Sequence, residues 1–204
     1  MNSITVGQQR LLLGKLVCVG RNFVAHIAEL GNEVPEQMVL FCKPGSALTE
    51  RLAASHGGEP LHYEAELCFA YQAGKLAAVA LGLDLTKRQL QSYLKAKGLP
   101  WERAKAFDGS ALLSPFVAYD AHQELEYELC LDGERLQHGR ESLMIHSPTA
   151  ILAETQGFMA LQDGDVLMTG TPSGVGVVPE GGVFTGRVWQ GEQTLLTVRW
   201  EAAC

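Results

Sequence analysis

The sequence has few basic residues and no long uninterrupted apolar run. Its 204 residues include 16 Lys and Arg against 23 Asp and Glu, which gives a formal net charge of −7. This balance argues against a nucleic-acid partner, because binding phosphates requires a basic face. The apolar run over residues 11–19 is broken by Lys15 and is too short to span a bilayer. We therefore expect neither a signal peptide nor a membrane segment.

The sequence also lacks paired cysteine motifs. Its 5 cysteines are scattered, odd in number and never in a C-x-x-C arrangement. Most lie in apolar runs, as buried free thiols do, so neither a disulfide framework nor a zinc site is indicated. This pattern favours a reducing, cytoplasmic location.

The chain is long enough to bury a sizeable core, and we expect one domain over residues 1–204. The pattern predicts an α+β protein, mainly β, because strands outnumber helices and do not alternate with them regularly. The strands and hairpins are expected at 16–19, 39–44, 61–71, 76–83, 126–136 and 187–200, with a turn at 72–75 and a turn followed by a strand within 161–168. The helices are expected between Asn22 and Gly31, from Thr86 to Gly98 and from Ser147 to Phe158, with Asn22, Thr86 and Ser147 as N-caps.

The stretch 61–67 carries two carboxylates at strand spacing. Side chains two apart on a strand share a face, so Glu64 and Glu66 project side by side. Charges this close repel each other unless something positive lies between them. A third carboxylate, Asp84, follows the next predicted strand. Three carboxylates without sulfur or imidazole favour Mg²⁺ or Mn²⁺ over Zn²⁺, although an isolated E-x-E pair is more often the solvated face of an edge strand.

Basic and small residues elsewhere complete a candidate site. His26 and Glu29 are three apart on a predicted helix, so Glu29 can fix the tautomer of His26 and raise its basicity; the alternative is an ordinary surface pair. An acidic protein that binds an anion needs local positive charge. Lys105 is the first candidate to supply it, and Arg21 and Lys43 are weaker ones. The glycines of the loop 169–176, including Gly170, allow backbone N–H groups to approach an anion.

These pieces follow one another in an order that resembles a known family. The motifs are V-C-V-G-R-N-F at 17–23, H-x-x-E at 26–29, F-x-K-P at 41–44, H-x-E-x-E-L at 62–67, L-D-L-T at 83–86, K-G-L-P-W-x-x-A-K-x-F-D at 97–108, M-I-H at 144–146 and G-D-V-L-x-T-G-T-P-x-G-V-G at 164–176. Together they resemble the fumarylacetoacetate hydrolase family, specifically its small acylpyruvase branch, from about residue 15 to the last hairpin.

The resemblance implies a mixed β-sandwich roll with a few short helices, usually as a homodimer. It implies metal ligation by Glu64, Glu66 and Asp84, acid–base chemistry by His26 and Glu29, a catalytic Lys105, and a contact between Thr171 and the substrate carboxylate. The substrates implied are small anionic keto acids, either 2,4-dioxo acids or β-keto diacids. The segments 45–60 and 67–83 are shorter than expected for the family, so the pocket walls near the metal ligands are expected to differ.

The reaction expected first is hydrolysis of an acylpyruvate to pyruvate and a carboxylic acid. A 2-oxo acid chelates a divalent cation through its carboxylate and keto oxygen, and the cation stabilises the enolate left when the adjacent C–C bond breaks. An oxaloacetate decarboxylase uses the same enolate, and an isomerase or tautomerase needs only the proton transfer. A non-catalytic homologue is the remaining alternative, and the sequence does not separate these possibilities.

Overall fold

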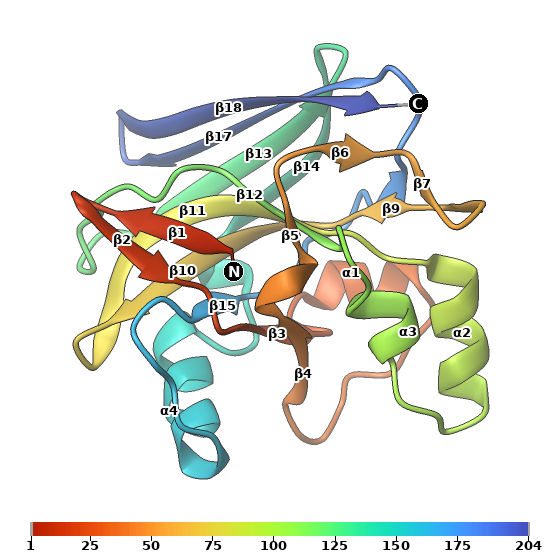
Figure 1. The fold of residues 1–204 in the computed structure, drawn as a ribbon, viewed down its shortest axis with the longest axis horizontal. Helices are drawn as coiled ribbons and strands as arrows, with labels where there is room; N and C mark the ends of the chain where they lie inside the picture. The colour runs from red at the N-terminus through yellow and green to blue at the C-terminus, as the bar shows by residue number, and fades with distance from the viewer. Residues whose placement is uncertain (1, 204) are drawn as a thin grey trace.

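Two stacked β-sheets form the body of the computed structural model, which describes residues 2–203 (Figure 1). The seven-stranded sheet has the order β4 (Val39–Pro44), β3 (Lys15–Gly20), β15 (Val166–Met168), β10 (Ala65–Gln72), β11 (Lys75–Asp84), β12 (Ala111–Leu113) and β5 (Leu48–Thr49). The five-stranded sheet has the order β14 (Glu134–Arg140), β13 (Leu125–Leu131), β17 (Val183–Gln190), β18 (Gln193–Ala203) and β6 (Leu52–Ala53). Three strand pairs accompany them: β1 (Ser3–Val6) with β2 (Gln9–Leu12), β7 (Ser55–His56) with β8 (Glu59–Pro60), and β9 (His62–Tyr63) with β16 (Gly176–Val177).

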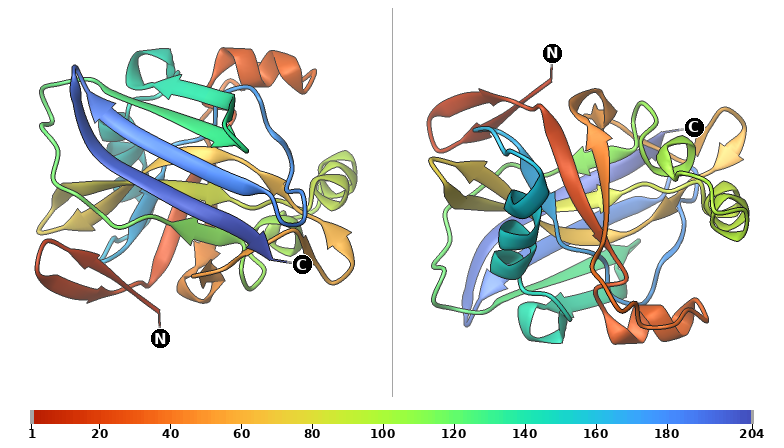
Figure 2. Two further views of the ribbon diagram at one scale, coloured as in Figure 1. Left: turned by 90° about the horizontal axis from the view of Figure 1, so that it is seen from above. Right: turned by 90° about the horizontal axis from the view of Figure 1, so that it is seen from below.

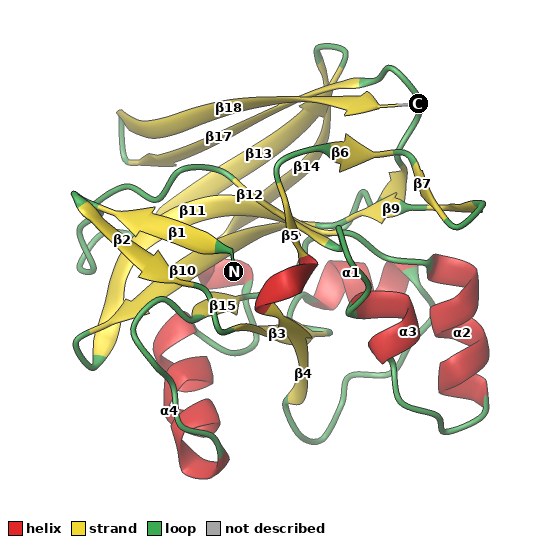
Figure 3. Cartoon of the chain, viewed as in Figure 1, coloured by secondary structure: helices red, strands yellow, loops and turns green. Residues whose placement is uncertain are grey.

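The helices are short and lie around the larger sheet (Figure 3). They are α1 (Val24–Glu29), α2 (Arg88–Ala96), α3 (Glu102–Lys105) and α4 (Pro148–Phe158), with 3₁₀ turns at Gly45–Ala47 and Glu141–Leu143. Helices α1, α2 and α3 lie toward one end of the sheets, and α4 lies toward the other. The view from above in Figure 2 shows the five-stranded sheet covering one face, and the view from below shows α4 crossing the opposite face. None of the helices among the described residues is long and apolar enough to cross a membrane.

The main hydrophobic core lies between the two sheets. Leu67 and Phe69 of β10 and Leu81 of β11 are fully buried there against residues of β13 and β17, including Phe184. The two sheets pack tightly at Gly186 of β17, where a Cβ atom would lie only 2.2 Å from Leu81 Cδ2. A larger residue at this position would have to displace the side chain of Leu81.

The alternation of side chains along β10 and β11 decides where the polar residues go. Ala65, Leu67 and Phe69 face the inter-sheet core, so Glu66 and Cys68 face the other side of the sheet. Asp84 shares that side, because Leu83 before it belongs to the inter-sheet core. The β10–β11 ladder pairs Ala65 with Leu83, and the amide of Asp84 donates to the carbonyl oxygen of Glu64 at 2.9 Å. The carboxylates thus meet at the end of this hairpin, on the face away from the inter-sheet core.

Most of the predicted elements are present, and the mainly β fold is confirmed. Strands β3, β4 and β11, the two C-terminal hairpins and helix α4 lie where they were predicted. The 72–75 turn is confirmed as well: Ala73 and Gly74 both have positive φ values, of 51° and 83°, in the tight turn that joins β10 and β11. Ser147 caps α4 as predicted, since its side chain accepts a hydrogen bond from the amide of Ala150.

Several local predictions were wrong. Asn22 does not cap α1; its buried side chain instead bonds the backbone of His146 and Thr169. Thr86 does not cap α2, which begins at Arg88, because its hydroxyl donates to the carbonyl oxygen of Asp84. The strand predicted over 61–71 is interrupted at Glu64. The β1–β2 hairpin and α3 had not been predicted.

The Ser147 cap gives a test of the local energetics. Ser147→Ala is expected to lower the free energy of unfolding by about 1 kcal/mol, because it leaves an amide at the start of α4 without its acceptor. Urea denaturation measures the change. Ser147→Asp, which keeps an acceptor at the cap, should match the wild type, and equal stability of wild type and Ser147→Ala would contradict the assignment.

Candidate metal centre and active site

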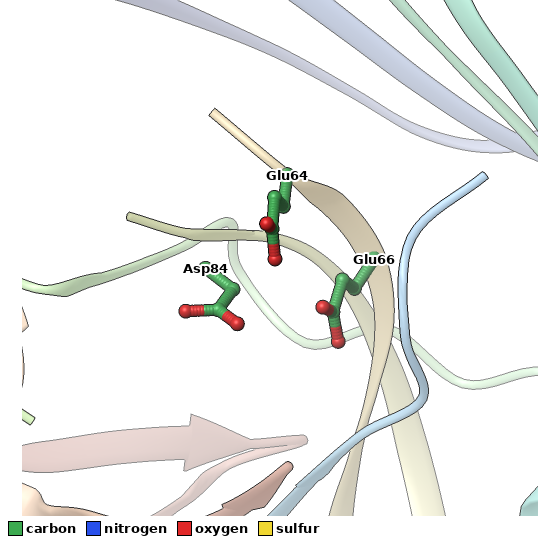
Figure 4. A group of neighbouring side chains, drawn as sticks. All are labelled: Glu64, Glu66 and Asp84. Carbon is green, nitrogen blue, oxygen red and sulfur yellow. The ribbon is translucent and has the colours of Figure 1, made fainter. Parts of the chain in front are cut away.

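Three buried carboxylates converge at the end of the β10–β11 hairpin. Glu64, Glu66 and Asp84 each offer an oxygen within 4.8 Å of the others, and their side chains point toward a common space (Figure 4). They are only 5%, 1% and 1% exposed. Burying carboxylates is costly unless positive charge compensates them, so the surroundings of this cluster decide its chemistry.

Three basic side chains from different elements supply compensation. Lys105 of α3 reaches both Glu64 and Asp84, with its Nζ atom 2.8 Å from Glu64 Oε2 and 2.6 Å from Asp84 Oδ2. Lys43 of β4 lies 2.8 Å from Asp84 Oδ1, and Arg88 at the start of α2 pairs with Glu64. Glu66 has no basic partner among residues 2–203, and its Oε2 atom accepts a hydrogen bond from the amide of Gly170 at 2.7 Å.

The pKa values of the two glutamates are shifted in opposite directions. Burial opposes ionisation of Glu64, but the charges of Lys105 and Arg88 outweigh it and hold the pKa of Glu64 well below its usual range. Burial, followed by the negative charges of Asp84 and Glu64, raises the pKa of Glu66 well above its usual range. For Lys105, burial lowers the pKa, but Asp84 and Glu64 outweigh it and raise the value. The cluster therefore retains one carboxyl group whose ionisation lacks compensation.

This cluster fits a hard divalent cation. Its donors are all carboxylate oxygens, which Mg²⁺ and Mn²⁺ prefer, and no sulfur ligand is close enough to join them among the described residues. A cation at this position would supply the positive charge that Glu66 lacks. Glu64, Glu66 and Asp84 are thus the residues that would hold the metal.

His26 and Glu29 form a pair beside the carboxylates. His26 Nδ1 lies 2.9 Å from Glu29 Oε2, and His26 lines the same cavity as Glu64, Glu66 and Asp84. The other oxygen of Glu29 accepts a hydrogen bond from the amide of Gly174 at 2.9 Å. Because Glu29 engages Nδ1, the Nε2 atom of His26 is the nitrogen left to exchange a proton with a ligand.

Thr171 lines the cavity from the loop after β15. The buried amide of Gln137 on β14 donates to Thr171 Oγ1 at 2.8 Å and to the carbonyl oxygen of Pro172 at 2.9 Å. Its own oxygen accepts from the amide of Ala65, between the two glutamates, at 2.9 Å. Gln137 therefore ties this loop to the strand that carries the carboxylates, and it occupies a lone pair of Thr171 so that the threonine hydroxyl is free to donate.

The cavity that these residues line is narrow. Its volume is about 40 Å³. Arg88 and Gln91 of α2, Arg21, and the aromatic rings of Phe41 and Trp101 complete the walls closest to the carboxylates. The cavity suits a small acid.

The structure places nearly all the predicted site residues around one cavity. The carboxylates, His26, Glu29, Lys105, Arg21, Gly170 and Thr171 lie at or beside it. Lys43 lies elsewhere: it is fully buried beneath Asp84, also donates to the carbonyl oxygen of Lys105, and does not line the cavity. In this position Lys43 can support Asp84, whereas the sequence predicts a contact between Lys43 and the substrate.

Two residues that matter to the site were missed in the sequence. Arg88 lies at the start of a helix and pairs with Glu64, 24 positions earlier in the chain, so no local spacing pointed to this contact. Gln137 lies in a hairpin far along the chain, and no local pattern connects it with Thr171.

Comparisons with known proteins agree with this geometry. Residues 15–199 match the family model described as fumarylacetoacetate (FAA) hydrolase C-terminal. An oxaloacetate tautomerase of Escherichia coli is 38% identical over 191 residues, which cover 85% of this chain and 87% of the relative. An oxaloacetate decarboxylase of Dictyostelium discoideum is 34% identical over 83% of this chain and 86% of the relative.

Solved structures give the same picture. The crystal structure of a fumarylpyruvate hydrolase from Pseudomonas aeruginosa, in complex with Mn²⁺ and pyruvate, superposes with a TM-score of 0.85, at 30% identity, covering 99% of this chain and 95% of the other. A structure from Oleispira antarctica, provisionally assigned as a fumarylacetoacetate isomerase or hydrolase, gives a TM-score of 0.92 at 33% identity, covering 99% and 100% of the two chains.

The ligand set predicts the effect of removing one charge. Asp84→Asn keeps the side-chain shape but is expected to lower Mn²⁺ affinity by at least about 100-fold, because losing even a supporting partner of a ligand typically costs 10- to 100-fold. Isothermal titration calorimetry measures the affinity. Asp108→Asn, an exposed carboxylate outside the cluster, is the control and should bind Mn²⁺ as the wild type does. Unchanged affinity in Asp84→Asn would rule out this ligand.

Proposed function

The chain belongs to the fumarylacetoacetate hydrolase family of enzymes, and from this we propose that it is a divalent-metal-dependent tautomerase that interconverts the enol and keto forms of oxaloacetate. The observation that carries the proposal is the His26–Glu29 pair in the same cavity as the carboxylate cluster. Relatives named oxaloacetate tautomerase, such as those of Escherichia coli and Arabidopsis thaliana, are each 38% identical to this chain over most of its length. These relatives favour the tautomerase interpretation over the acylpyruvate hydrolysis that we had placed first.

The reaction moves one proton, breaks no C–C bond and leaves the overall oxidation state unchanged: the C2=C3 double bond of the enol becomes a single bond as the C2–O bond becomes a carbonyl. Enol-oxaloacetate gains a proton at C3 and loses the one on its C2 hydroxyl, which passes to solvent. A divalent cation held by Glu64, Glu66 and Asp84 would supply positive charge near the C2 oxygen, where negative charge develops.

The chain's own residues divide the remaining tasks. His26 delivers the proton to C3 from Nε2, or removes it in reverse, while Glu29 on Nδ1 stabilises the protonated imidazole. Lys105 holds Glu64 and Asp84 in place and adds positive charge beside the substrate oxygens. The Thr171 hydroxyl, with Gln137 on its lone pair, donates to the C1 carboxylate. Phe41 and Trp101 restrict the access of water.

Decarboxylation of oxaloacetate is the second candidate, because one relative is named as a decarboxylase. It requires a cation close to the 2-oxo group and needs no base at C3. Hydrolysis of acylpyruvates additionally needs a water positioned at the distal carbonyl. The three reactions therefore differ in how far they depend on His26.

We further propose that the site belongs to one catalytic domain that acts as a homodimer in a reducing, cytoplasmic compartment. The cavity is lined by residues from position 19 to position 171, which supports a single domain. The four cysteines within the described residues are all free thiols, which supports the compartment. The homodimer stays a prediction from the family resemblance, and Mg²⁺ or Mn²⁺ as the bound cation stays a prediction from the three carboxylates.

The decisive experiment presents oxaloacetate and acetylpyruvate to the Mn²⁺-loaded protein and to His26→Gln. Tautomerisation is followed by the ultraviolet absorbance of the enol, and cleavage is followed by pyruvate release. We expect fast loss of enol without pyruvate, slowed in His26→Gln by about 10²- to 10⁴-fold, the usual share of general acid–base catalysis. Mn²⁺ affinity should be unchanged in His26→Gln.

Other outcomes of that experiment point to the other reactions. Pyruvate from oxaloacetate that persists in His26→Gln would identify a decarboxylase. Pyruvate from acetylpyruvate that is lost in His26→Gln would restore the hydrolase. If the wild-type protein converts neither oxaloacetate nor acetylpyruvate, all three proposed reactions are refuted.

The position of Gln137 predicts an effect on KM. Gln137→Glu cannot donate to Thr171, so the threonine hydroxyl turns toward the new carboxylate and is lost to the substrate. We expect KM for oxaloacetate to rise by about tenfold, the equivalent of one ordinary hydrogen bond at about 1.4 kcal/mol, with a smaller change in kcat. In a Thr171→Ala background the same substitution should change KM no further; an additive effect would show that Gln137 acts by another route.

A further inference from the structure

Two cations that line the cavity have no carboxylate partner among the described residues. The basic residues near the metal cluster, Lys43, Arg88 and Lys105, each form an ion pair. Arg21 and Lys95 line the same cavity, yet neither forms an ion pair within residues 2–203. In a chain with a net charge of −7, two half-buried cations without an acidic partner call for a physical explanation.

Both cations turn toward one neutral oxygen. Lys95 Nζ donates to Asn32 Oδ1 at 2.9 Å, and Arg21 Nη2 donates to the same atom at 3.3 Å. One amide oxygen cannot satisfy the donors of an ammonium and a guanidinium group. Arg21 Nε is buried without any hydrogen-bond partner. The two side chains therefore leave donors that an anion between them would satisfy.

The electrostatics of Lys95 and the backbone of Arg21 show that the fold holds two mutually repelling cations together. Burial, followed by the positive charges of Arg21 and Arg88, lowers the pKa of Lys95. Arg21 has a positive φ of 58°, which is unfavourable for a residue with a side chain and is seen mostly where surrounding structure enforces it. The fold thus holds Arg21 beside Lys95 although their charges repel each other.

We propose that Arg21 and Lys95 form a second anion-binding pole that holds the distal carboxylate of a 2-oxo dicarboxylic acid. This inference rests on the proposed function, in which the 2-oxo end of the substrate lies at the carboxylate cluster. Because both ends of the cavity then bind an anionic group, the site selects short dicarboxylates over 2-oxo acids that carry a single carboxylate. Asn32 holds the two cations in position until the substrate carboxylate takes over their donors.

A purely structural role for Lys95 predicts something different. Lys95 lies in the last turn of α2, where a cation interacts favourably with the helix dipole, and its bond to Asn32 ties the helix to the segment after α1. A residue with only these roles would affect stability and would affect the binding of all ligands alike. Selectivity between a dicarboxylate and a matched monocarboxylate separates the two roles.

The test compares two acids that differ only at the distal end. Oxaloacetate carries a carboxylate where 2-oxobutyrate carries a methyl group. Binding of each to the Mn²⁺-loaded protein is measured by calorimetry, with pyruvate release followed in the same sample. Lys95→Met is the test variant. Lys97→Met is the matched control, because this exposed lysine follows the same helix and does not line the cavity.

We expect Lys95→Met to weaken oxaloacetate binding by about tenfold or more and to leave 2-oxobutyrate binding within about twofold of the wild type. Arg21→Met should act in the same direction, and Lys97→Met should change neither. Equal losses for the two acids, no loss for either, or no preference of the wild type for oxaloacetate would overturn the proposal.

The outcome is separable from that of the proposed function. Lys95-dependent binding of oxaloacetate by a protein that does not tautomerise it would uphold the dicarboxylate site and refute the tautomerase. Tautomerase activity with a wild-type KM in Lys95→Met would uphold the tautomerase and refute the dicarboxylate site.

Discussion

The burial of three carboxylates at the end of one hairpin is the constraint on which the rest of the site depends. Bringing Glu64, Glu66 and Asp84 out of water is tolerable only because cations arrive from β4, α2 and α3. Each of these elements is short, and each places one basic residue against the cluster. The charges leave Glu66 uncompensated, and this imbalance explains why the cluster fits a cation.

Much of the candidate site could be predicted because its residues follow strand or helix periodicity. Glu64 and Glu66 are two apart beside a buried strand, and His26 and Glu29 are three apart on a helix, so local spacing predicted each pair. Arg88, Lys95 and Gln137 could not be found in this way. They reach the site through the packing of α2 and of the second sheet, and this packing leaves no periodic trace in the sequence.

The secondary structure, like the site, was predictable only where local sequence patterns determine it. The hairpins and α4 were predictable from alternation and capping residues, whereas the interruption at Glu64 and the start of α2 at Arg88 were not. Both misjudged boundaries lie at the site. Thr86 and Asn22 are residue types that often cap helices. Here the Thr86 hydroxyl donates to the carbonyl oxygen of Asp84, and the Asn22 amide donates to the carbonyl oxygen of Thr169 in the 169–176 loop. Local preference was overridden where tertiary contacts to the site competed for the same polar groups.

The parallel pairing of β3 with β15 has a consequence for how the protein is made. It joins Leu16 to Val166 and Cys18 to Met168 in the middle of the larger sheet, so residues near the two ends of the chain must meet there. Until the ribosome has released the second of these strands, one edge of the apolar β3 stays unpaired and open to wrong partners. Synthesis at a typical rate of about 5–20 residues per second leaves this edge exposed for many seconds. During that time β4 is the only one of the two strands bordering β3 in the folded sheet that has been synthesised, so it alone can cover an edge of the strand that leads into the active site.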